Sequence, residues 1–173
     1  MTPRVVIKLG GGLITDKSSM KKFNHDTVER IVESISSVVG MGVPIIIIHG
    51  AGSFGHLLAK EWSISNGLVH DIAQEQRMIV DEIRSDMREL NRLVIDKLAD
   101  SRLESESLPP SEWAIGTGPD FQGEIENFQR DADAPLPITF GDVVNTNDNL
   151  EFGILSGDDL MLRLSRELEV SHS

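Results

Sequence analysis

A run of isoleucines leads directly into a glycine-rich segment that ends in histidine, and this segment could bind a phosphate group. Isoleucine occupies positions 45–48, and His49-Gly50-Ala51-Gly52-Ser53-Phe54-Gly55-His56 follows. The glycines allow a tight turn and a close approach to a ligand, because they carry no Cβ. A helix that begins near Ser53 would direct unpaired N–H groups at a bound anion, and His56 could donate to the same anion. A turn that serves only strand-to-helix packing is the alternative.

A second glycine segment, residues 10–12, follows a short apolar strand that contains Lys8. A lysine in an apolar strand is costly to bury unless its ammonium group reaches a partner, and a phosphate would supply one. The two strands with a helical segment between them predict a βαβ unit with parallel strands. Ligands bind at the carboxyl ends of such strands. We therefore expect both glycine segments, the first of them as a flexible loop, to face one ligand.

The positioning elements follow from hydrophobic spacing. Four β-branched residues in a row predict a strand that is covered on both faces, as in a parallel sheet. A helix is predicted from Asp26 to Gly40, with Asp26 and Glu29 as a capping box. Residues 13–22, between the first glycine segment and this helix, are expected to form a loop or a short ordered flap. A long amphipathic helix, or two in sequence, is predicted between about Asp71 and Asp100, packed on the sheet.

The second half of the chain gives weaker signals. Residues 101–134 are rich in Pro, Gly and Ser and are predicted to be irregular or hairpin-like. Residues 136–140 are predicted to form a short strand, and residues 145–149 a turn. A final helix is predicted to open at Ser156 and to close at about Val170. Asp158 or Asp159 could cap this helix, or one of the two carboxylates could orient the lysines of the phosphate site.

Composition limits the possible functions. With 173 residues and 39% apolar content, the chain is expected to form a single domain over residues 1–173. A net charge of −12 argues against a nucleic-acid partner. The sequence has no span of membrane length and no signal-peptide pattern, so we expect a soluble, cytoplasmic protein. The absence of cysteine excludes disulfides, and the five scattered histidines suggest no metal-ligand cluster.

Five motifs, in their order and spacing, resemble the amino acid kinase family over nearly the whole chain. They are Lys8-Leu9-Gly10-Gly11-Gly12, Thr15-Asp16-Lys17, the segment 49–56, Gly141-Asp142-Val143-Val144 and Ser156-Gly157-Asp158-Asp159. The resemblance implies an α/β fold: a three-layer αβα sandwich with a mainly parallel central sheet. Within the family, His56 and residues 87–94 are most similar to the isopentenyl phosphate kinases of isoprenoid biosynthesis. This resemblance implies that the protein uses ATP and Mg²⁺. It also implies transfer of a phosphoryl group to isopentenyl phosphate, which gives isopentenyl diphosphate.

The resemblance also implies roles for single residues on the donor side. Lys8 would stabilise charge on the transferring phosphoryl group, and Lys17 would add a second cation. Backbone amides would hold the ATP phosphates, at Gly10, Gly11, Gly12 and Gly52.

On the acceptor side, the resemblance implies that His56 hydrogen-bonds the phosphate of the substrate. The amides of Gly50, Ala51 and Gly157 would assist, and Asp158 would hold the lysines in place. Lys8, Lys17, His56 and Asp158 are thus the implied catalytic residues. The substrate tail would lie along residues 57–62 and 79–87, whose bulk would set the depth of the pocket.

Family members continue well beyond residue 170, and that continuation supplies most of the nucleotide contacts. The resemblance therefore implies a C-terminally truncated chain that holds only the acceptor-binding portion and has little or no kinase activity alone. One alternative is an inactive or regulatory module that binds a phosphorylated metabolite. Another is a kinase of the family with a different small phosphorylated or carboxylated acceptor. The expected partner is a small molecule, not nucleic acid or a membrane, and a homodimer is an option.

Overall fold

A computed structural model describes residues 4–168 and 170–172. Its central sheet contains five parallel strands in the order β3-β4-β2-β1-β7. These strands are β1 (Arg4–Leu9), β2 (Ile45–His49), β3 (Ser105–Ser107), β4 (Leu136–Phe140) and β7 (Val170–His172). Two further strands, β5 (Asp142–Asn145) and β6 (Phe152–Leu155), form an antiparallel hairpin. The predicted parallel sheet is confirmed.

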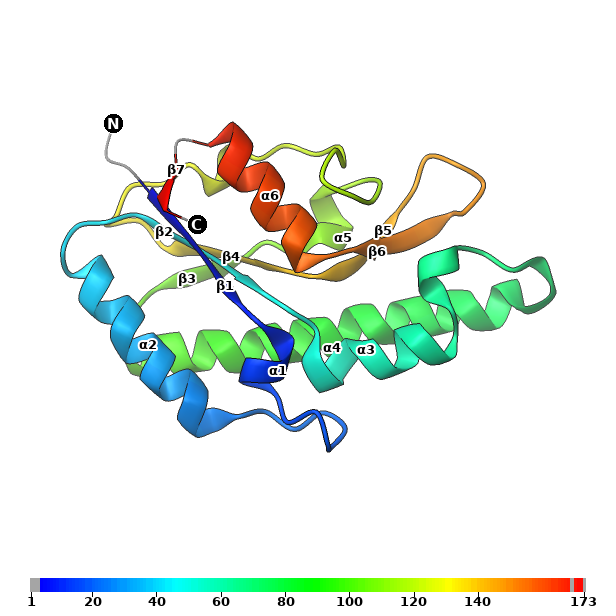
Figure 1. Ribbon diagram of the computed structural model, residues 1–173, viewed down its shortest axis with the longest axis horizontal. Helices are drawn as coiled ribbons and strands as arrows, with labels where there is room; N and C mark the ends of the chain where they lie inside the picture. Colours follow the sequence, from blue (N-terminus) through cyan, green and yellow to red (C-terminus); the bar gives the residue numbers. More distant parts are fainter. Residues whose placement is uncertain (1–3, 169, 173) are drawn as a thin grey trace.

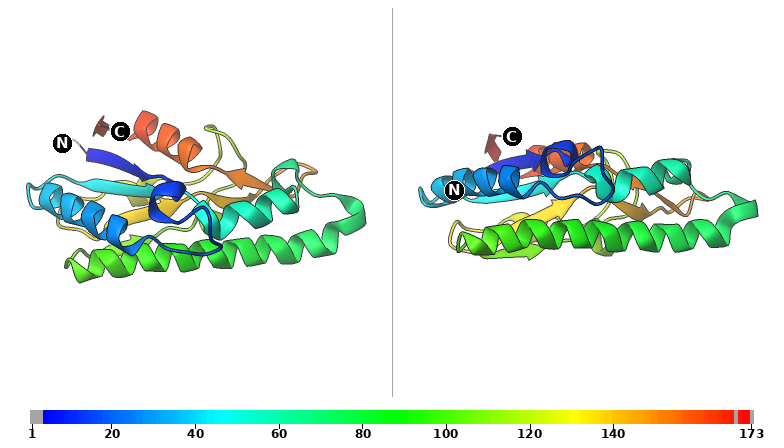
Figure 2. Two further views of the ribbon diagram at one scale, coloured as in Figure 1. Left: turned by 60° about the horizontal axis from the view of Figure 1, so that its bottom comes forward. Right: turned by 90° about the horizontal axis from the view of Figure 1, so that it is seen from below.

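Helices cover the sheet on both sides, as Figure 1 shows. One side carries α2 (His25–Val39), α3 (Gly52–Glu61) and α4 (Ala73–Asp100), and the other carries α5 (Pro110–Trp113) and α6 (Gly157–Glu167). A short helix, α1 (Gly11–Ile14), follows β1, and three 3₁₀ turns complete the described elements: Ile64–Asn66, His70–Ile72 and Glu126–Phe128. Both views in Figure 2 show α4 running along almost the whole length of the molecule. The three-layer αβα architecture expected from the sequence is confirmed.

The four isoleucines of β2 explain why two helical layers are needed. Ile45 and Ile47 belong to the core shared with α2 and α4, and Ile46 and Ile48 belong to the core shared with α6. Alternate residues of a strand point to opposite faces, so a fully apolar strand has to be covered twice. All four side chains are at most 2% exposed.

Two helix predictions have different outcomes. The long amphipathic segment forms one helix, α4, rather than two. The helix before β2 ends at Val39, with Gly40 as its C-cap, as predicted. However, the capping box at its start is wrong: α2 begins at His25, Asn24 is its N-cap, and no side chain caps it. Asp26 instead lies in the first turn, where its charge favours the helix dipole.

Three backbone segments differ from the sequence prediction. Gly11 and Gly12 form the first turn of α1 rather than a flexible loop, and the Leu13 N–H donates to the Gly10 carbonyl. The region 101–134 has an antiparallel bridge between Ile115 and Gln122, as expected for a hairpin-like segment, but it also contains β3, an edge strand next to β4. The final helix ends at Glu167 rather than near Val170, and Val170–His172 form β7 beside β1.

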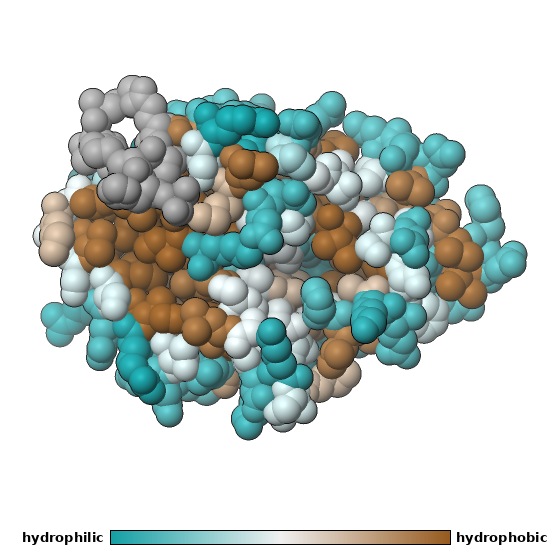
Figure 3. Space-filling view, in the orientation of Figure 1, coloured by the Kyte–Doolittle hydropathy of each residue, from teal (hydrophilic) through white to brown (hydrophobic). Residues whose placement is uncertain are grey.

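The surface of the described residues is mixed. The face drawn in Figure 3 has a broad hydrophobic area over the part of the sheet that contains β1 and β2, with hydrophilic residues around its margins. Among the described helices, none is both long and apolar enough to cross a bilayer. The cytoplasmic location stays a prediction.

Candidate functional site

The two glycine segments pack against each other at the carboxyl ends of β1 and β2. A Cβ added to Gly11 would lie 2.2 Å from the Gly52 nitrogen, and one added to Gly50 would lie 2.7 Å from the Gly11 nitrogen. The Gly50 N–H also donates to the Leu9 carbonyl at 2.9 Å. Only residues without a side chain permit this approach of two backbones. The expectation that both segments face one site is confirmed.

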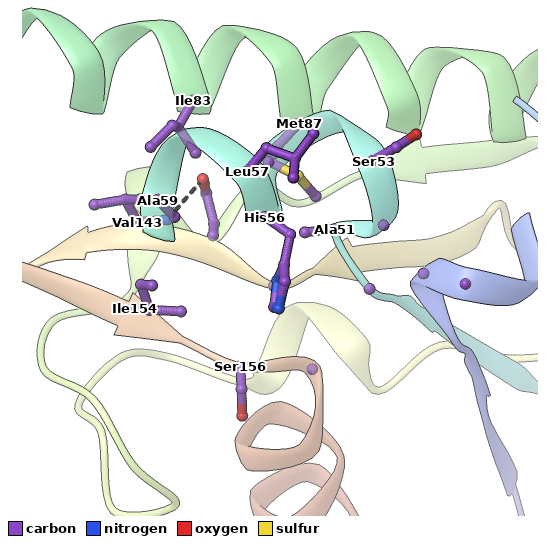
Figure 4. A pocket seen from close by; sticks show the side chains of 18 of the residues that line it. Ala51, Ser53, His56, Leu57, Ala59, Ile83, Met87, Val143, Ile154 and Ser156 are labelled. Carbon is purple, nitrogen blue, oxygen red and sulfur yellow. Dashed lines mark hydrogen bonds between the residues drawn. The ribbon is translucent and has the colours of Figure 1, made fainter. Parts of the chain in front are cut away.

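A cavity of about 470 Å³ opens beside this contact. Its polar end is formed by the two glycine segments, Lys8, Lys17 and the start of α6, and its other end is apolar. Figure 4 shows the apolar side chains converging from α3, α4 and the β5–β6 hairpin. The apolar end is lined by Leu57, Ala59, Ile83, Met87, Val143 and Ile154. Residues 57–62 and 79–87 thus each contribute lining side chains, as expected.

Two adjacent carboxylates at the start of α6 have separate partners. The Ser156 hydroxyl accepts from the Asp159 N–H at 3.1 Å, and the Asp159 carboxylate accepts from the Ser156 N–H at 3.3 Å, which is a capping box. Asp158 instead accepts a hydrogen bond from the Lys8 ammonium group. Asp159 therefore has the predicted capping role, and Asp158 contacts one of the two predicted lysines, while its catalytic role stays a prediction.

Lys17 belongs to a short ordered flap, residues 15–23, that closes over the first glycine segment. A Cβ on Gly12 would lie 2.1 Å from the Lys17 Cε, so the lysine side chain passes directly over that glycine. Within the flap, the Asp16 carboxylate accepts from the Ser18 N–H at 2.9 Å and from the Ser18 hydroxyl at 2.6 Å. These bonds and the Lys22 ammonium group lower the pKa of Asp16 to about 2.

The flap is also tied to the helices behind it. The Lys21 N–H donates to the Ser53 carbonyl at 3.3 Å, and the Lys21 ammonium group donates to the Asp86 carboxylate at 2.5 Å. The Ser53 N–H donates to the Thr15 hydroxyl at 3.0 Å. These contacts join the flap to α3 and α4, and they hold Lys17 beside the cavity.

His56 lies one turn inside α3, at the edge of the cavity, and is exposed. In Figure 4 its imidazole extends from α3 towards Ser156 at the start of α6. The ring therefore lies between two helix N-termini, where the N–H groups of both helices favour an anion. His56 thus lies at the cavity, and its predicted hydrogen bond to a phosphate stays a prediction.

A buried histidine next to this site has a different setting. His49 is fully buried, and its ring nitrogens lie 3.0 Å from the Gly50 oxygen and 3.0 Å from the Asn91 Oδ1. Burial lowers the pKa of His49, which favours its neutral form. Sequence reasoning assigned no role to either side chain. Asn91 lies four residues after Met87 on the apolar face of α4, and a polar residue at such a position is a usable signal.

Asp142 is a second residue without an assigned role in the sequence analysis, although its motif supports the family resemblance. It lines the cavity, and its carboxylate accepts from the Ser111 N–H at 3.2 Å and from the Val143 N–H at 2.9 Å. Burial raises the pKa of Asp142, and these hydrogen bonds oppose the rise.

The structure brings most of the predicted site residues to one cavity, while their roles stay predictions. Two predicted residues lie outside its lining: Gly10 is the N-cap of α1, and Asp158 contacts the cavity through Lys8. Nowhere in residues 4–168 and 170–172 do three or more acidic or histidine side chains gather to hold a metal ion. The lining includes Lys8, Gly11, Gly12, Lys17, Gly50, Ala51, Gly52, His56 and Gly157.

Comparisons with known proteins find relatives that match nearly the whole chain. Isopentenyl phosphate kinase of Methanocaldococcus jannaschii is 29% identical over 174 residues, which cover 95% of this chain and 65% of that protein. The enzyme of Thermoplasma acidophilum is 30% identical over 165 residues, with 95% and 63% covered. A solved structure of isopentenyl phosphate kinase superposes with a TM-score of 0.87 at 28% identity, over 97% of this chain and 69% of that one.

The chain thus spans less than two thirds of the length of these two relatives. The family model for amino acid kinases matches residues 3–172, which is nearly the whole chain. The parallel sheet and the paired glycine segments agree with this match. The chain belongs to the amino acid kinase family.

Proposed function

We propose that this chain forms the acceptor-binding part of an isopentenyl phosphate kinase, which transfers the γ-phosphoryl group of ATP to the phosphate of isopentenyl phosphate. The observation that carries the proposal is the two-ended cavity, with glycine amides, lysines and His56 at one end and aliphatic side chains at the other. A small alkyl phosphate has the same division. The similarity to isopentenyl phosphate kinases supports this choice within the family.

The acceptor phosphate would lie between α3 and α6. His56 would donate a hydrogen bond to it, and the Ala51 and Gly157 N–H groups would add further donors. The five-carbon tail would extend towards Ile83 and Met87, where burial of its surface contributes about 25 cal/mol per Å². A carboxylated amino acid acceptor would bring a charged ammonium group towards this apolar end, which is unfavourable.

The donor phosphates would lie beside the first glycine segment. Lys8 and Lys17 flank that segment, and Asp158 holds the Lys8 ammonium group in place. Phosphoryl transfer requires little covalent help, so positioning and neutralisation of developing charge would constitute the catalysis. Mg²⁺, when bound, would neutralise charge between the phosphates. It binds through substrate phosphates more often than in an all-protein cage, which fits the scattered carboxylates of this site.

Binding to the 173-residue chain tests the acceptor site directly. Calorimetry should give a higher affinity for isopentenyl phosphate than for inorganic phosphate or for isopentenol, because only the first fills both ends of the cavity. His56→Ala should weaken isopentenyl phosphate binding about tenfold or more, as expected for a hydrogen bond to a charged group. His70→Ala is the matched control, since His70 is an exposed histidine outside the cavity lining.

Equal affinity for the three ligands, or equal affinity of His56→Ala and the unmutated chain, would contradict the acceptor assignment. Conversion of isopentenyl phosphate in the presence of ATP and Mg²⁺ is a separate measurement. Little or no turnover by this chain alone stays a prediction, and so does a homodimer. Binding without turnover, in a chain extended to the length of its isopentenyl phosphate kinase relatives, would favour the alternative of an inactive binding module.

A further inference from the structure

A row of polar side chains, of which His49 and Asn91 are buried and Ser107 is half-buried, leads from the edge of the sheet to the second glycine segment. Ser107 on β3 has its Oγ 2.6 Å from the Asn91 Nδ2, and the Asn91 Oδ1 lies 3.0 Å from the His49 Nε2. The His49 Nδ1 in turn lies 3.0 Å from the Gly50 carbonyl oxygen. His49 is 0% and Asn91 is 2% exposed. Side chains from β3, α4 and β2 are therefore linked in a row, and His49 at its end contacts the Gly50 carbonyl.

The chemistry of these atoms decides where the proton of His49 lies. A neutral imidazole carries one N–H, and the Gly50 carbonyl can only accept, so the proton is on Nδ1. The Nε2 then requires a donor. A half-turn of the Asn91 amide, which exchanges two nearly equivalent atoms, brings its NH₂ to Nε2. The Ser107 hydroxyl can then donate to the amide oxygen, and all members of the row are satisfied.

The ring plane of His49 is fixed as well. Its imidazole stacks on Phe140 of the neighbouring strand, with ring centroids 5.1 Å apart and planes 21° apart. Phe140 is itself fully buried. The Nδ1–H group therefore has a single direction in which to donate, which is towards the Gly50 carbonyl.

Fixing that carbonyl also fixes the amide on the other side of the same peptide bond. In a trans peptide, the C=O and N–H groups point to opposite sides, so holding the Gly50 oxygen on the ring turns the Ala51 N–H away from it. Both residues line the cavity. Among the described residues, no protein group accepts a hydrogen bond from the Ala51 N–H or the Gly52 N–H. Within that part of the chain, the Ala51 N–H therefore has no protein acceptor to hold it in place.

We propose that His49, held by Asn91 and Ser107, is a positioning residue that fixes the Gly50–Ala51 peptide so that the Ala51 N–H faces the acceptor phosphate. This inference rests on the proposed function for the identity of the ligand. His49 would act by orienting the Gly50–Ala51 peptide, whereas His56 would contact the ligand directly.

Two substitutions separate this role from packing. Asparagine carries its NH₂ on Cγ, where imidazole carries Nδ1, whereas glutamine carries its NH₂ one atom further out. His49→Asn should therefore keep most of the affinity for isopentenyl phosphate, within about twofold, and His49→Gln should lose about tenfold, as for one hydrogen bond. A packing role predicts the opposite order, because glutamine fills more of the ring's volume. That order, measured by calorimetry, would overturn the proposal.

A second measurement needs no ligand. Nitrogen-15 spectra of the unmutated chain at neutral pH should show His49 with its proton on Nδ1, and a proton on Nε2 or on both nitrogens would overturn the proposal. The Ala51 amide resonance should shift on addition of isopentenyl phosphate, and less in His49→Gln. If the chain binds no isopentenyl phosphate, the proposed function fails. The positioning role is then still decided by the tautomer of His49 in the unmutated chain and by the Ala51 amide resonance in the two variants.

Discussion

Removing Lys21 should loosen the flap that holds Lys17 beside the cavity. The Lys21 ammonium group lies 2.5 Å from one carboxylate oxygen of Asp86 and 3.9 Å from Glu89. The Asp86 side chain is 7% exposed and that of Lys21 is 39% exposed. No hydrogen bond from another described residue reaches the second buried oxygen of Asp86. Lys21→Met would therefore leave a nearly buried carboxylate without its cation.

The expected loss of unfolding free energy lies between two known cases. Removing one partner of a fully buried ion pair costs about 3–5 kcal/mol, whereas an exposed pair contributes less than about 1 kcal/mol. Because the lysine end is more than one third exposed, solvent screens the pair, and we expect about 2 kcal/mol for Lys21→Met. Asp86→Asn should cost less, since it leaves no buried charge. In the double variant, a coupling energy of about 1 kcal/mol should appear.

Urea unfolding of the unmutated chain, both single variants and the double variant closes this cycle. Lys22→Met is the matched control: Lys22 pairs with Asp16 in the same flap, but its side chain is 62% exposed, so little change is expected. A coupling energy near zero, or equal losses for Lys21→Met and Lys22→Met, would refute the reasoning.

Two further predictions concern the site's backbone. Burial lowers the pKa of His49 below its ordinary value of 6.5, so the unfolded chain takes up a proton that the folded chain does not. The free energy of unfolding should therefore keep its full value above pH 6.5 and fall by up to about 1.4 kcal/mol per pH unit below pH 6.5. Urea unfolding at several pH values should show that His49→Asn removes this dependence. The same fall with pH in His49→Asn and in the unmutated chain would contradict the prediction. Gly52→Ala should cost about 2 kcal/mol, because φ is +51° and the new Cβ would lie 2.1 Å from the Thr15 hydroxyl oxygen. Gly10→Ala, with no atom within 4 Å of its Cβ, should change stability little, and equal losses would contradict this explanation.

The sequence predicted the elements whose own side chains specify them. The unbroken apolar residues of Ile45–His49 predict a strand that is buried on both faces. The apolar face that α4 keeps over its 28 residues predicts a helix. β3 was missed because Ser105-Glu106-Ser107 has no apolar alternation, so only its neighbour β4 makes it a strand. The start of α2 was misplaced because a capping-box pattern at Asp26 competes with Asn24, which is the actual N-cap.

The site divides in the same way. Its glycine segments and lysines could be found because their spacing along the chain carries the signal. The row from His49 through Asn91 to Ser107 could not be found, because each of these residues is an ordinary polar residue until the three elements that carry them meet. The residues alone do not separate Asp158 from Asp159, and only the family resemblance assigned the lysines to Asp158. In the structure, the direction of α6 relative to Lys8 separates the two carboxylates.

The ion pair between Lys8 and Asp158 has a consequence for the order of folding. It joins positions 150 residues apart, so the chain has to close nearly its whole length before this contact forms. Contacts of such long sequence separation form late, because their closure entropy is repaid only once the intervening structure exists. A chain still emerging from the ribosome would hold both glycine segments before α6 could dock. Any phosphate affinity that depends on this ion pair would then appear only after α6 has docked on the sheet.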